Sequence, residues 1–190
     1  MKYLAGYGLS IIIMFSPQSL LADEAIWKSL EGGAKVIVMR HAPVERGKGR
    51  GNSSLRDPSC KKERNLSDEG IKQAIKIGEI FRQKNIPVTK ILHSPFCRTA
   101  DTARLAFDEV SSSELLFLLE VLPADIAAEQ TDKLNNLIGS FKGPGNLVLI
   151  THEPNIRAIS FETVKHLDFV VMNPEVDDSF EELGVIRLFK

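Results

Sequence analysis

The chain has 190 residues, which is enough for one domain or at most two. Its composition, 43% apolar and 26% charged, is that of a globular protein and excludes disordered, collagen-like and fibrous chains. The formal net charge of −1 excludes a general basic field for nucleic-acid binding, so no nucleic-acid partner is expected, although a local basic pocket is still compatible with it. Two cysteines are too few for a disulfide-rich scaffold or a four-cysteine zinc site.

The first 22 residues differ from the rest because they carry a single charge, that of Lys2. A short basic start, an apolar run and a polar stretch ending at Ala22 are arranged as in a secretory signal peptide. Glycines and a proline interrupt the run and make it short for a membrane span. We therefore expect a signal peptide over residues 1–22 and a periplasmic or secreted domain over residues 23–190 that does not insert stably into membranes. An uncleaved anchor and a buried first helix are the alternatives.

Beyond residue 22, short apolar runs alternate with segments of helical periodicity. The apolar runs predict strands over 35–39, 90–92, 115–119, 146–151, 169–172 and 185–189. Helices are predicted over 24–30, 68–84, 97–107, 126–141 and 154–163. Ser67 is a suitable N-cap for the second helix. The buried face of that helix is predicted to carry Ile71, Ala74, Ile75, Gly78 and Phe81. This alternation predicts an α/β domain with a largely parallel sheet.

Three motifs rich in basic side chains follow directly after predicted strands. They are Arg40-His41, Ser94-Pro95-Phe96-Cys97-Arg98 and Thr151-His152-Glu153-Pro154. The carboxyl ends of parallel strands line one edge of an open α/β sheet, and ligands bind at that edge. We therefore expect two arginines and two histidines to meet there. Arg98 also falls in the first turn of its helix, where backbone N–H groups favour an anion.

Arginine and histidine in this combination point to phosphate chemistry. Guanidinium groups present forked donors that match phosphate oxygens, and a neutral histidine among them can attack phosphorus. Two histidines could also bind a metal, but no Cys, Asp or Glu has a metal-like spacing from either, and two arginines would repel a dication. Taken alone, His152 could be a core histidine and Arg98 a solvated helix residue. His93 and His166 lack such a context, and we expect them to be structural or surface residues.

The order of these motifs resembles that of the histidine phosphatase superfamily. The strand with Arg40-His41 is similar to the family's first motif, with Ala42 where its commonest form has glycine. Residues 65–70 resemble its L-[ST]-x-x-G helix start, residues 94–103 its S-P-x-x-R-x-x-x-T-A segment, and residues 149–152 the strand that carries its second histidine. The resemblance covers about residues 35–189. It is greatest to short bacterial phosphatases of the first branch, which include exported members acting on lipopolysaccharide heptose phosphate; the full-length mutases carry insertions that this chain lacks.

The resemblance implies a three-layer α/β/α sandwich of the phosphoglycerate-mutase-like fold and a phosphatase that hydrolyses phosphomonoesters. His41 would be the nucleophile and become phosphohistidine, which water then hydrolyses. Arg40, Arg98 and His152 would hold the phosphoryl oxygens and stabilise the transition state. The mechanism needs no metal and no organic cofactor. The partner would be a small-molecule or envelope phosphoester, such as a sugar phosphate.

The family also uses a carboxylate to protonate the leaving group, and here several carboxylates compete for that role. Glu120 is named first because it follows the third predicted strand; Asp125, Asp101 and Glu153 are further candidates. Residues 165–168 lack the glycine expected from similar sequences. Two alternatives therefore stay open: a protein phosphohistidine phosphatase, and a non-catalytic phosphate- or polyanion-binding protein.

The segment from Ala42 to Arg64 is predicted to be a long loop at the border of the pocket. Its basic residues would suit a polyanionic substrate, unless the loop is simply a solvated surface. They are Arg46, Lys48, Arg50 and Arg56. An exported protein could also form a disulfide between Cys60 and Cys97, which would fasten this loop to the residue next to Arg98. Two buried free thiols are the alternative.

Overall fold

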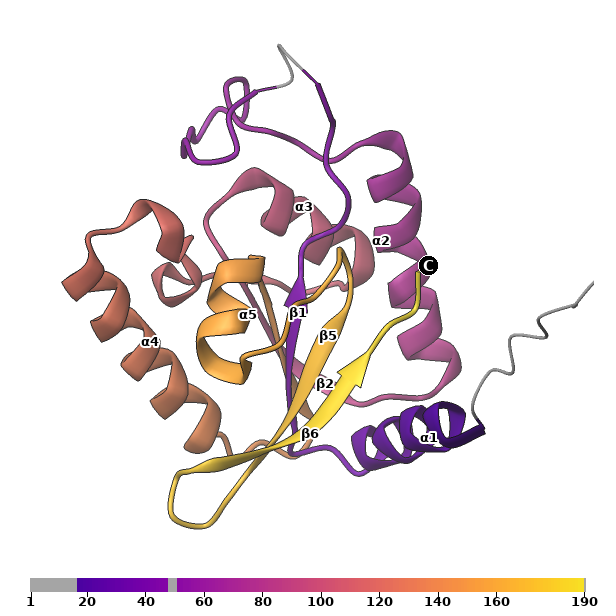
Figure 1. Cartoon of the computed structure of the whole chain (residues 1–190). Coiled ribbons are helices and arrows are strands. Elements are labelled where there is room, and N and C mark those ends of the chain that lie inside the picture. Colours follow the sequence, from indigo (N-terminus) through magenta and orange to yellow (C-terminus); the bar gives the residue numbers. More distant parts are fainter. Residues whose placement is uncertain (1–16, 48–50, 190) are drawn as a thin grey trace, which may run out of the picture.

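A computed structural model describes residues 17–47 and 51–189, with the backbone alone for residues 17–22. They form a sheet with helices on both faces, so the predicted three-layer α/β/α fold is confirmed (Figure 1). The described strands are β1 (Val36–Arg40), β2 (Val88–His93), β3 (Ser111–Ser112), β4 (Asn146–Thr151), β5 (Phe169–Pro174) and β6 (Phe180–Ile186). The described helices are α1 (Pro17–Glu31), α2 (Asp68–Gln83), α3 (Cys97–Ala106), α4 (Ala124–Gly139) and α5 (Glu153–Ser160).

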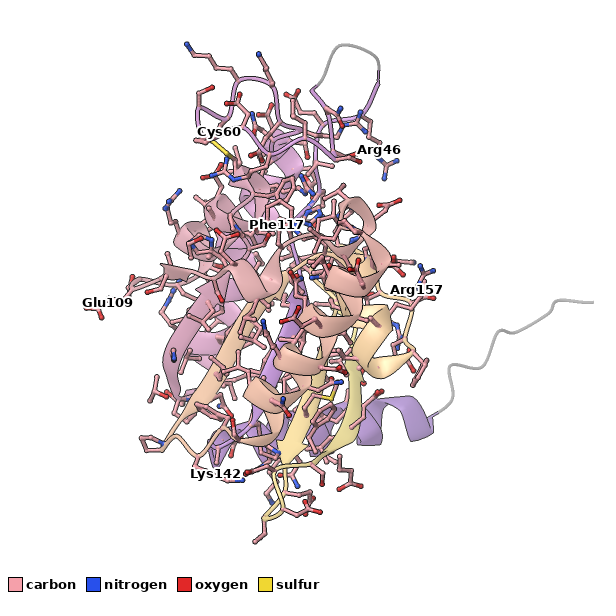
Figure 2. The ribbon with its side chains drawn as sticks, turned by 90° about the vertical axis from the view of Figure 1, so that its left-hand side faces the viewer. Arg46, Cys60, Glu109, Phe117, Lys142 and Arg157 are labelled. Carbon is pink, nitrogen blue, oxygen red and sulfur yellow. A yellow bond between two sulfur atoms is a disulfide. The ribbon has the colours of Figure 1, made fainter. Side chains whose placement is uncertain are left out.

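The described strands form one six-stranded sheet in the order β3-β2-β4-β1-β5-β6. Strands β1 to β4 run parallel, whereas β5 and β6 are antiparallel to their neighbours. In this register Arg40 pairs with Thr151 and His93 pairs with Ile150, so β1, β4 and β2 end at the same edge. The loop after β1 extends beyond this edge, with Arg46 and Cys60 at that end of the molecule and Lys142 at the opposite end (Figure 2).

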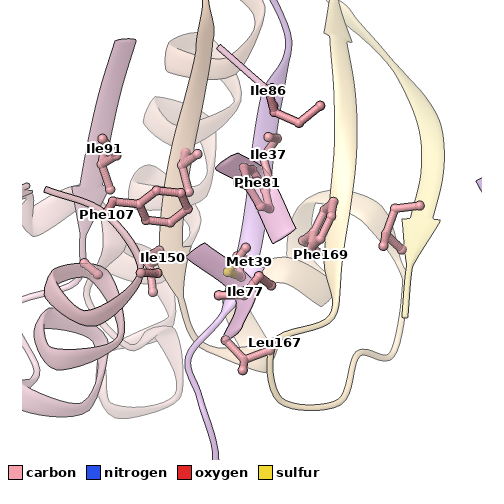
Figure 3. Close-up of a cluster of buried hydrophobic side chains, with 14 of the residues drawn as sticks. Ile37, Met39, Ile77, Phe81, Ile86, Ile91, Phe107, Ile150, Leu167 and Phe169 are labelled. Atoms are coloured by element: carbon pink, nitrogen blue, oxygen red, sulfur yellow. The ribbon is translucent and has the colours of Figure 1, made fainter. Parts of the chain in front are cut away.

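Each face of the sheet has its own hydrophobic cluster. Ile37 and Met39 of β1 pack into a cluster with α1, α2 and α3, part of which is shown in Figure 3. Val36 and Val38 point the other way, into a cluster with α4 and α5. Neither face of a strand that is covered by helices on both sides contacts solvent, which explains the unbroken apolar run in the sequence.

Helix α2 begins as predicted, and the predicted buried face is confirmed at Ala74, Gly78 and Phe81. The Ser67 hydroxyl caps it by accepting from Gly70 N at 3.0 Å. The prediction that Ile71 and Ile75 are buried is wrong, because they are 39% and 41% exposed, whereas Ile77 is buried. Helix α3 approaches this face closely, since a Cβ on Gly78 would lie 2.1 Å from the Ala106 carbonyl oxygen.

The predicted strand over 115–119 is wrong. This segment forms two short 3₁₀ turns, Glu114–Leu116 and Leu119–Val121. Backbone groups of this segment find their hydrogen-bond partner in a side chain and not in a neighbouring strand. Asn155 donates to Phe117 O at 2.7 Å and accepts from Leu119 N at 3.2 Å. The apolar run fits this arrangement because Leu116 is buried in the second cluster.

Helix α1 begins before the predicted helix and crosses the predicted cleavage position after Ala22. The α1 side chains in the described core are Ile26, Trp27 and Leu30, and all three come after that position. Residues 1–16 of the predicted signal peptide lie outside the described residues. Among the helices of the described residues, none is long and apolar enough to cross a membrane.

Candidate active site

A cavity of about 560 Å³ opens at the carboxyl edge of the sheet. Its lining contains all four residues of the predicted phosphate site, namely Arg40, His41, Arg98 and His152. The parallel register explains this convergence, because β1 and β4 are neighbours and α3 begins just after β2. The structure therefore brings the three motifs together, while the chemical roles of these residues stay predictions.

His41 is held as a neutral imidazole with one nitrogen available. Its backbone N–H donates to Thr151 O at 3.0 Å, and its Nδ1 donates to Ala42 O at 2.8 Å, which leaves Nε2 unprotonated. Burial lowers the pKa of His41 well below its usual range, and the nearby His152 and Arg98 lower it further. A neutral Nε2 is the form that a nucleophilic histidine requires.

Ala42 does not disturb this arrangement. It is fully buried in the first hydrophobic cluster, and its φ is not positive, so the position does not require glycine. Its N–H donates to the Thr102 hydroxyl at 3.0 Å, which ties the residue after the nucleophile to α3.

Arg98 lies in the first turn of α3 and is only 3% exposed. Its guanidinium lies over the Phe96 ring, 4.5 Å from the centroid, and Nη2 donates to His152 Nδ1 at 3.1 Å. Nη1 is buried and has no partner in the structure. Burial lowers the pKa of Arg98 to about 10, so the group is still charged at neutral pH.

Both ring nitrogens of His152 have protein partners. Nδ1 accepts from Arg98, and Nε2 donates to the Ser94 hydroxyl at 2.9 Å. Burial lowers the pKa of His152 well below its usual range, and Arg98 and Arg40 add to the effect. His152 is therefore a neutral group bonded to Arg98 and Ser94, and its predicted contact with the phosphoryl oxygens stays a prediction.

Arg40 supplies a second guanidinium from the end of β1. Its Nη1 donates to Val164 O at 2.7 Å, while its Nε is buried without a partner. Buried N–H groups without acceptors are costly, and more so on charged groups. Arg40 Nε and Arg98 Nη1 are therefore two donors in one pocket for which an anion would be the missing acceptor.

His166 also lines the pocket, a position that the sequence analysis did not predict. Its ring centroid lies 5.1 Å from that of His41, and Nδ1 donates to His41 O at 3.1 Å. The turn after α5 reaches β1 because Leu167 N donates to Arg40 O at 3.1 Å. Leu167 adopts a left-handed φ of 62°, in the segment where the family resemblance led us to expect a glycine. His93, in contrast, is buried beside Ser94, outside this lining.

Two of the four candidate acids lie in the pocket. Glu120, in the second 3₁₀ turn, and Glu153, at the start of α5, both line it. Asp125 lies in the first turn of α4 and is not in the lining. Asp101 is not in the lining either, and its carboxylate pairs with Arg104 at 3.3 Å on the exposed side of α3.

The loop after β1 borders the pocket, but through residues other than those predicted. Lys48 and Arg50 lie outside the described residues, and neither Arg46 nor Arg56 is in the lining. Arg64 lines the pocket instead, together with Ser53 and Val44. Cys60 and Cys97 are joined by a disulfide (Figure 2), which fastens the loop to the first residue of α3.

The titratable side chains do not form a metal centre in the described part of the chain. No group of three or more His, Cys, Asp or Glu residues there is arranged to hold a metal ion.

Comparison with solved structures shows the same fold in several proteins. The protein histidine phosphatase SixA in complex with tungstate matches with a TM-score of 0.54 and 13% identity, over 80% of this chain and 96% of that one. A phosphoserine phosphatase from Entamoeba histolytica, in complex with 3-phosphoglyceric acid, matches with a TM-score of 0.59 and 13% identity, over 81% and 97%. The protein of open reading frame Rv3214 from Mycobacterium tuberculosis gives 0.56 and 16%, over 78% and 94%. At these identities the likeness shows the phosphoglycerate-mutase-like fold.

A sequence comparison supports a family through part of the chain. The model of the histidine phosphatase superfamily, branch 1, matches residues 36–116. This match supports branch 1 of that superfamily. The matched segment contains Arg40, His41 and Arg98, whereas His152 lies beyond it. A comparison with curated proteins finds no match.

Proposed function

We propose that the protein hydrolyses phosphomonoesters through a phosphohistidine formed on His41. The observation that carries this proposal is the pairing of a neutral, buried His41 with unpartnered guanidinium donors of Arg40 and Arg98 in one cavity. A neutral imidazole is the nucleophilic form of histidine, and guanidinium groups on the phosphoryl oxygens stabilise the transition state of its attack on phosphorus. The superfamily match and the phosphatases among the solved structures of this fold support the same reaction class.

In the first step, Nε2 of His41 attacks phosphorus, the N–P bond forms and the bond to the ester oxygen breaks. The leaving oxygen takes a proton from a carboxylic acid, a role that we assign to Glu120. Arg40 and Arg98 neutralise the equatorial oxygens, and Nδ1–H of His41 keeps its bond to Ala42 O while the ring becomes cationic. In the second step, water attacks phosphorus, the N–P bond breaks, and the carboxylate accepts the water proton.

We further propose that the protein works in the periplasm or outside the cell, on an envelope or sugar phosphate. The arrangement of residues 1–22 supports export. The disulfide between Cys60 and Cys97 supports an oxidising compartment. A cavity of about 560 Å³ leaves room for a leaving group of sugar size beside the phosphoryl group.

The test compares the protein with its His41→Asn variant on p-nitrophenyl phosphate and on a panel of sugar phosphates and lipopolysaccharide. His41→Asn should lower kcat by about 1,000-fold or more, while His93→Asn, outside the cavity, serves as the matched histidine control. Acid quenching of the wild-type protein with a radiolabelled substrate should trap label on the protein, but not on His41→Asn. Equal activity of wild type and His41→Asn would contradict the proposal. Phosphate binding without turnover of any ester would show a binding protein instead.

A further inference from the structure

The junction between the loop and α3 is built around a buried carboxylate, Glu63, which is only 2% exposed. Its Oε2 accepts from the backbone N–H of Cys97, the first residue of α3, at 2.8 Å. Its Oε1 accepts from Arg56 Nη1 at 2.8 Å and from Asp57 N at 2.9 Å. Both oxygens are therefore used to connect the loop to the helix, at the helix end that favours a negative charge.

The disulfide makes a second connection at the same point. Cys97 is bonded to Cys60 through its sulfur and to Glu63 through its backbone N–H. In the contact between Glu63 and Cys97, each residue is followed in the sequence by an arginine, namely Arg64 and Arg98. Both of these arginines line the cavity.

The loop holds Arg64 in place from several sides. Its backbone N–H donates to Asn52 O at 3.1 Å, and its Nη2 donates to Gly51 O at 3.2 Å. The two arms of the loop touch here, since a Cβ on Gly51 would lie 2.0 Å from the Glu63 carbonyl oxygen. Gly51 also has a φ of 81°, so this position favours glycine for both reasons.

Arg64 nevertheless keeps an unused donor. Its Nε is buried without a partner, like Arg40 Nε and Arg98 Nη1 in the same cavity. Arg64 is also close enough to lower the pKa of Arg98 electrostatically, whereas Glu63 raises it. Cations that repel one another at close range become favourable when a shared anion binds between them.

We propose that Arg64 is a third phosphate-binding arginine of this cavity, held beside Arg98 by Glu63 and by the Cys60–Cys97 disulfide. The inference rests on the proposed function only in so far as the cavity takes a phosphate group. It does not require turnover. The loop thus supplies a phosphate-binding side chain to the site, and the disulfide fixes the position of that side chain.

The experiment measures the binding of inorganic phosphate by calorimetry, near neutral pH and at low salt. Arg64→Met should weaken binding by about 10- to 100-fold, the effect of one hydrogen bond to a charged group. Lys61→Met is the matched control, because it removes one positive charge from an exposed position of the same loop and should change binding less than about twofold. Arg64→Lys, which keeps the charge but loses the forked donors of the guanidinium group, should bind phosphate with intermediate affinity.

The role of the disulfide is tested in a second background, Cys60→Ser with Cys97→Ser. Freeing the loop should weaken phosphate binding. Arg64→Met should then lower the phosphate affinity much less than it does with the disulfide intact. Circular dichroism and urea unfolding show that each variant is folded. If the double serine variant does not fold, the comparison of Arg64→Met with Lys61→Met in the bonded protein still decides the role of Arg64.

Each outcome decides the inference separately from the proposed function. Unchanged phosphate affinity in Arg64→Met, or no phosphate binding by the wild type, would overturn the inference. An equal loss from Arg64→Met in both backgrounds would overturn the role of the disulfide. Weaker phosphate binding by Arg64→Met together with no hydrolysis of any ester would support the inference and contradict only the proposed phosphatase.

Discussion

The imidazole of His166 lies against that of His41, with ring centroids 5.1 Å apart, and donates to the His41 backbone carbonyl. Two histidines at this distance cannot both be charged beside two arginines. Burial lowers the pKa of His166 to about 4, and Arg40, Arg46 and Arg98 contribute. The cavity therefore combines permanent guanidinium charges with neutral imidazoles.

This arrangement predicts how stability depends on pH. Burial, as the largest cause, lowers the pKa of all four histidines, so in mildly acidic solution the folded protein binds fewer protons than the unfolded chain. The free energy of unfolding should then have its maximum above about pH 7.5. It should fall as the pH drops through about 6.5, the pKa of histidine in the unfolded chain. Urea unfolding at a series of pH values above 5 measures this.

The contribution of the nucleophile can be separated from the rest. His41→Asn should reduce the slope of the free energy of unfolding against pH by at most about 1.4 kcal/mol per pH unit. An unchanged slope in His41→Asn would show that His41 titrates normally in the folded protein.

Glu120 should act as the general acid, and the leaving group reveals it. Glu120→Gln should lower kcat on β-glycerophosphate by roughly 10²–10⁴-fold, because an alkoxide leaves poorly without a proton. The same variant should lose much less on p-nitrophenyl phosphate, since p-nitrophenolate is a good leaving group. Glu153→Gln, which changes the other candidate acid in the lining of the cavity, is the matched comparison. A selective loss in Glu153→Gln instead would assign the acid to Glu153.

The disulfide should also stabilise the whole domain. Cys60 and Cys97 are 37 residues apart, and closing a loop of that size contributes roughly 3–4 kcal/mol in the chain-entropy model. The variant with both cysteines replaced by serine should therefore unfold at a lower urea concentration. A midpoint equal to that of wild type would show that the bonded loop adds nothing to global stability.

Phe161→Gly should stabilise the protein. Phe161 ends α5 in a left-handed conformation with a φ of 58°, and it is 90% exposed, so its ring contributes little packing. Glycine adopts this conformation without the steric cost of a Cβ, which predicts a gain of about 0.5–1 kcal/mol. Phe161→Ala keeps the Cβ and should give no gain. Thermal unfolding compares the three proteins, and a lower melting temperature for Phe161→Gly than for Phe161→Ala would refute the argument.

The parts of the fold that could be predicted are those with strong local patterns. The strand Asn146–Thr151 has the predicted bounds because an unbroken apolar run between turn residues fits a strand buried on both faces. Arg40, His41, Arg98 and His152 could be placed together because each directly follows a strand or opens a helix at one edge.

The parts that could not be predicted depend on contacts between distant segments. His166 reaches the cavity only because β5 runs beside β1, which brings the turn before β5 to His41. Glu63 and Arg64 lie in a long loop without periodicity, and their positions follow from contacts with Cys97 and Gly51. The apolar residues of 115–119 carry no local sign that Asn155 would satisfy their backbone.

The bond between Cys60 and Cys97 has a practical consequence for anyone who produces this protein. Material made in a reducing cytosol and material made in an oxidising compartment would share one sequence but differ in whether the loop is fastened to α3. Two laboratories could then measure different phosphate affinities for the same chain. The thiol content of a preparation therefore belongs beside every kinetic value measured on it.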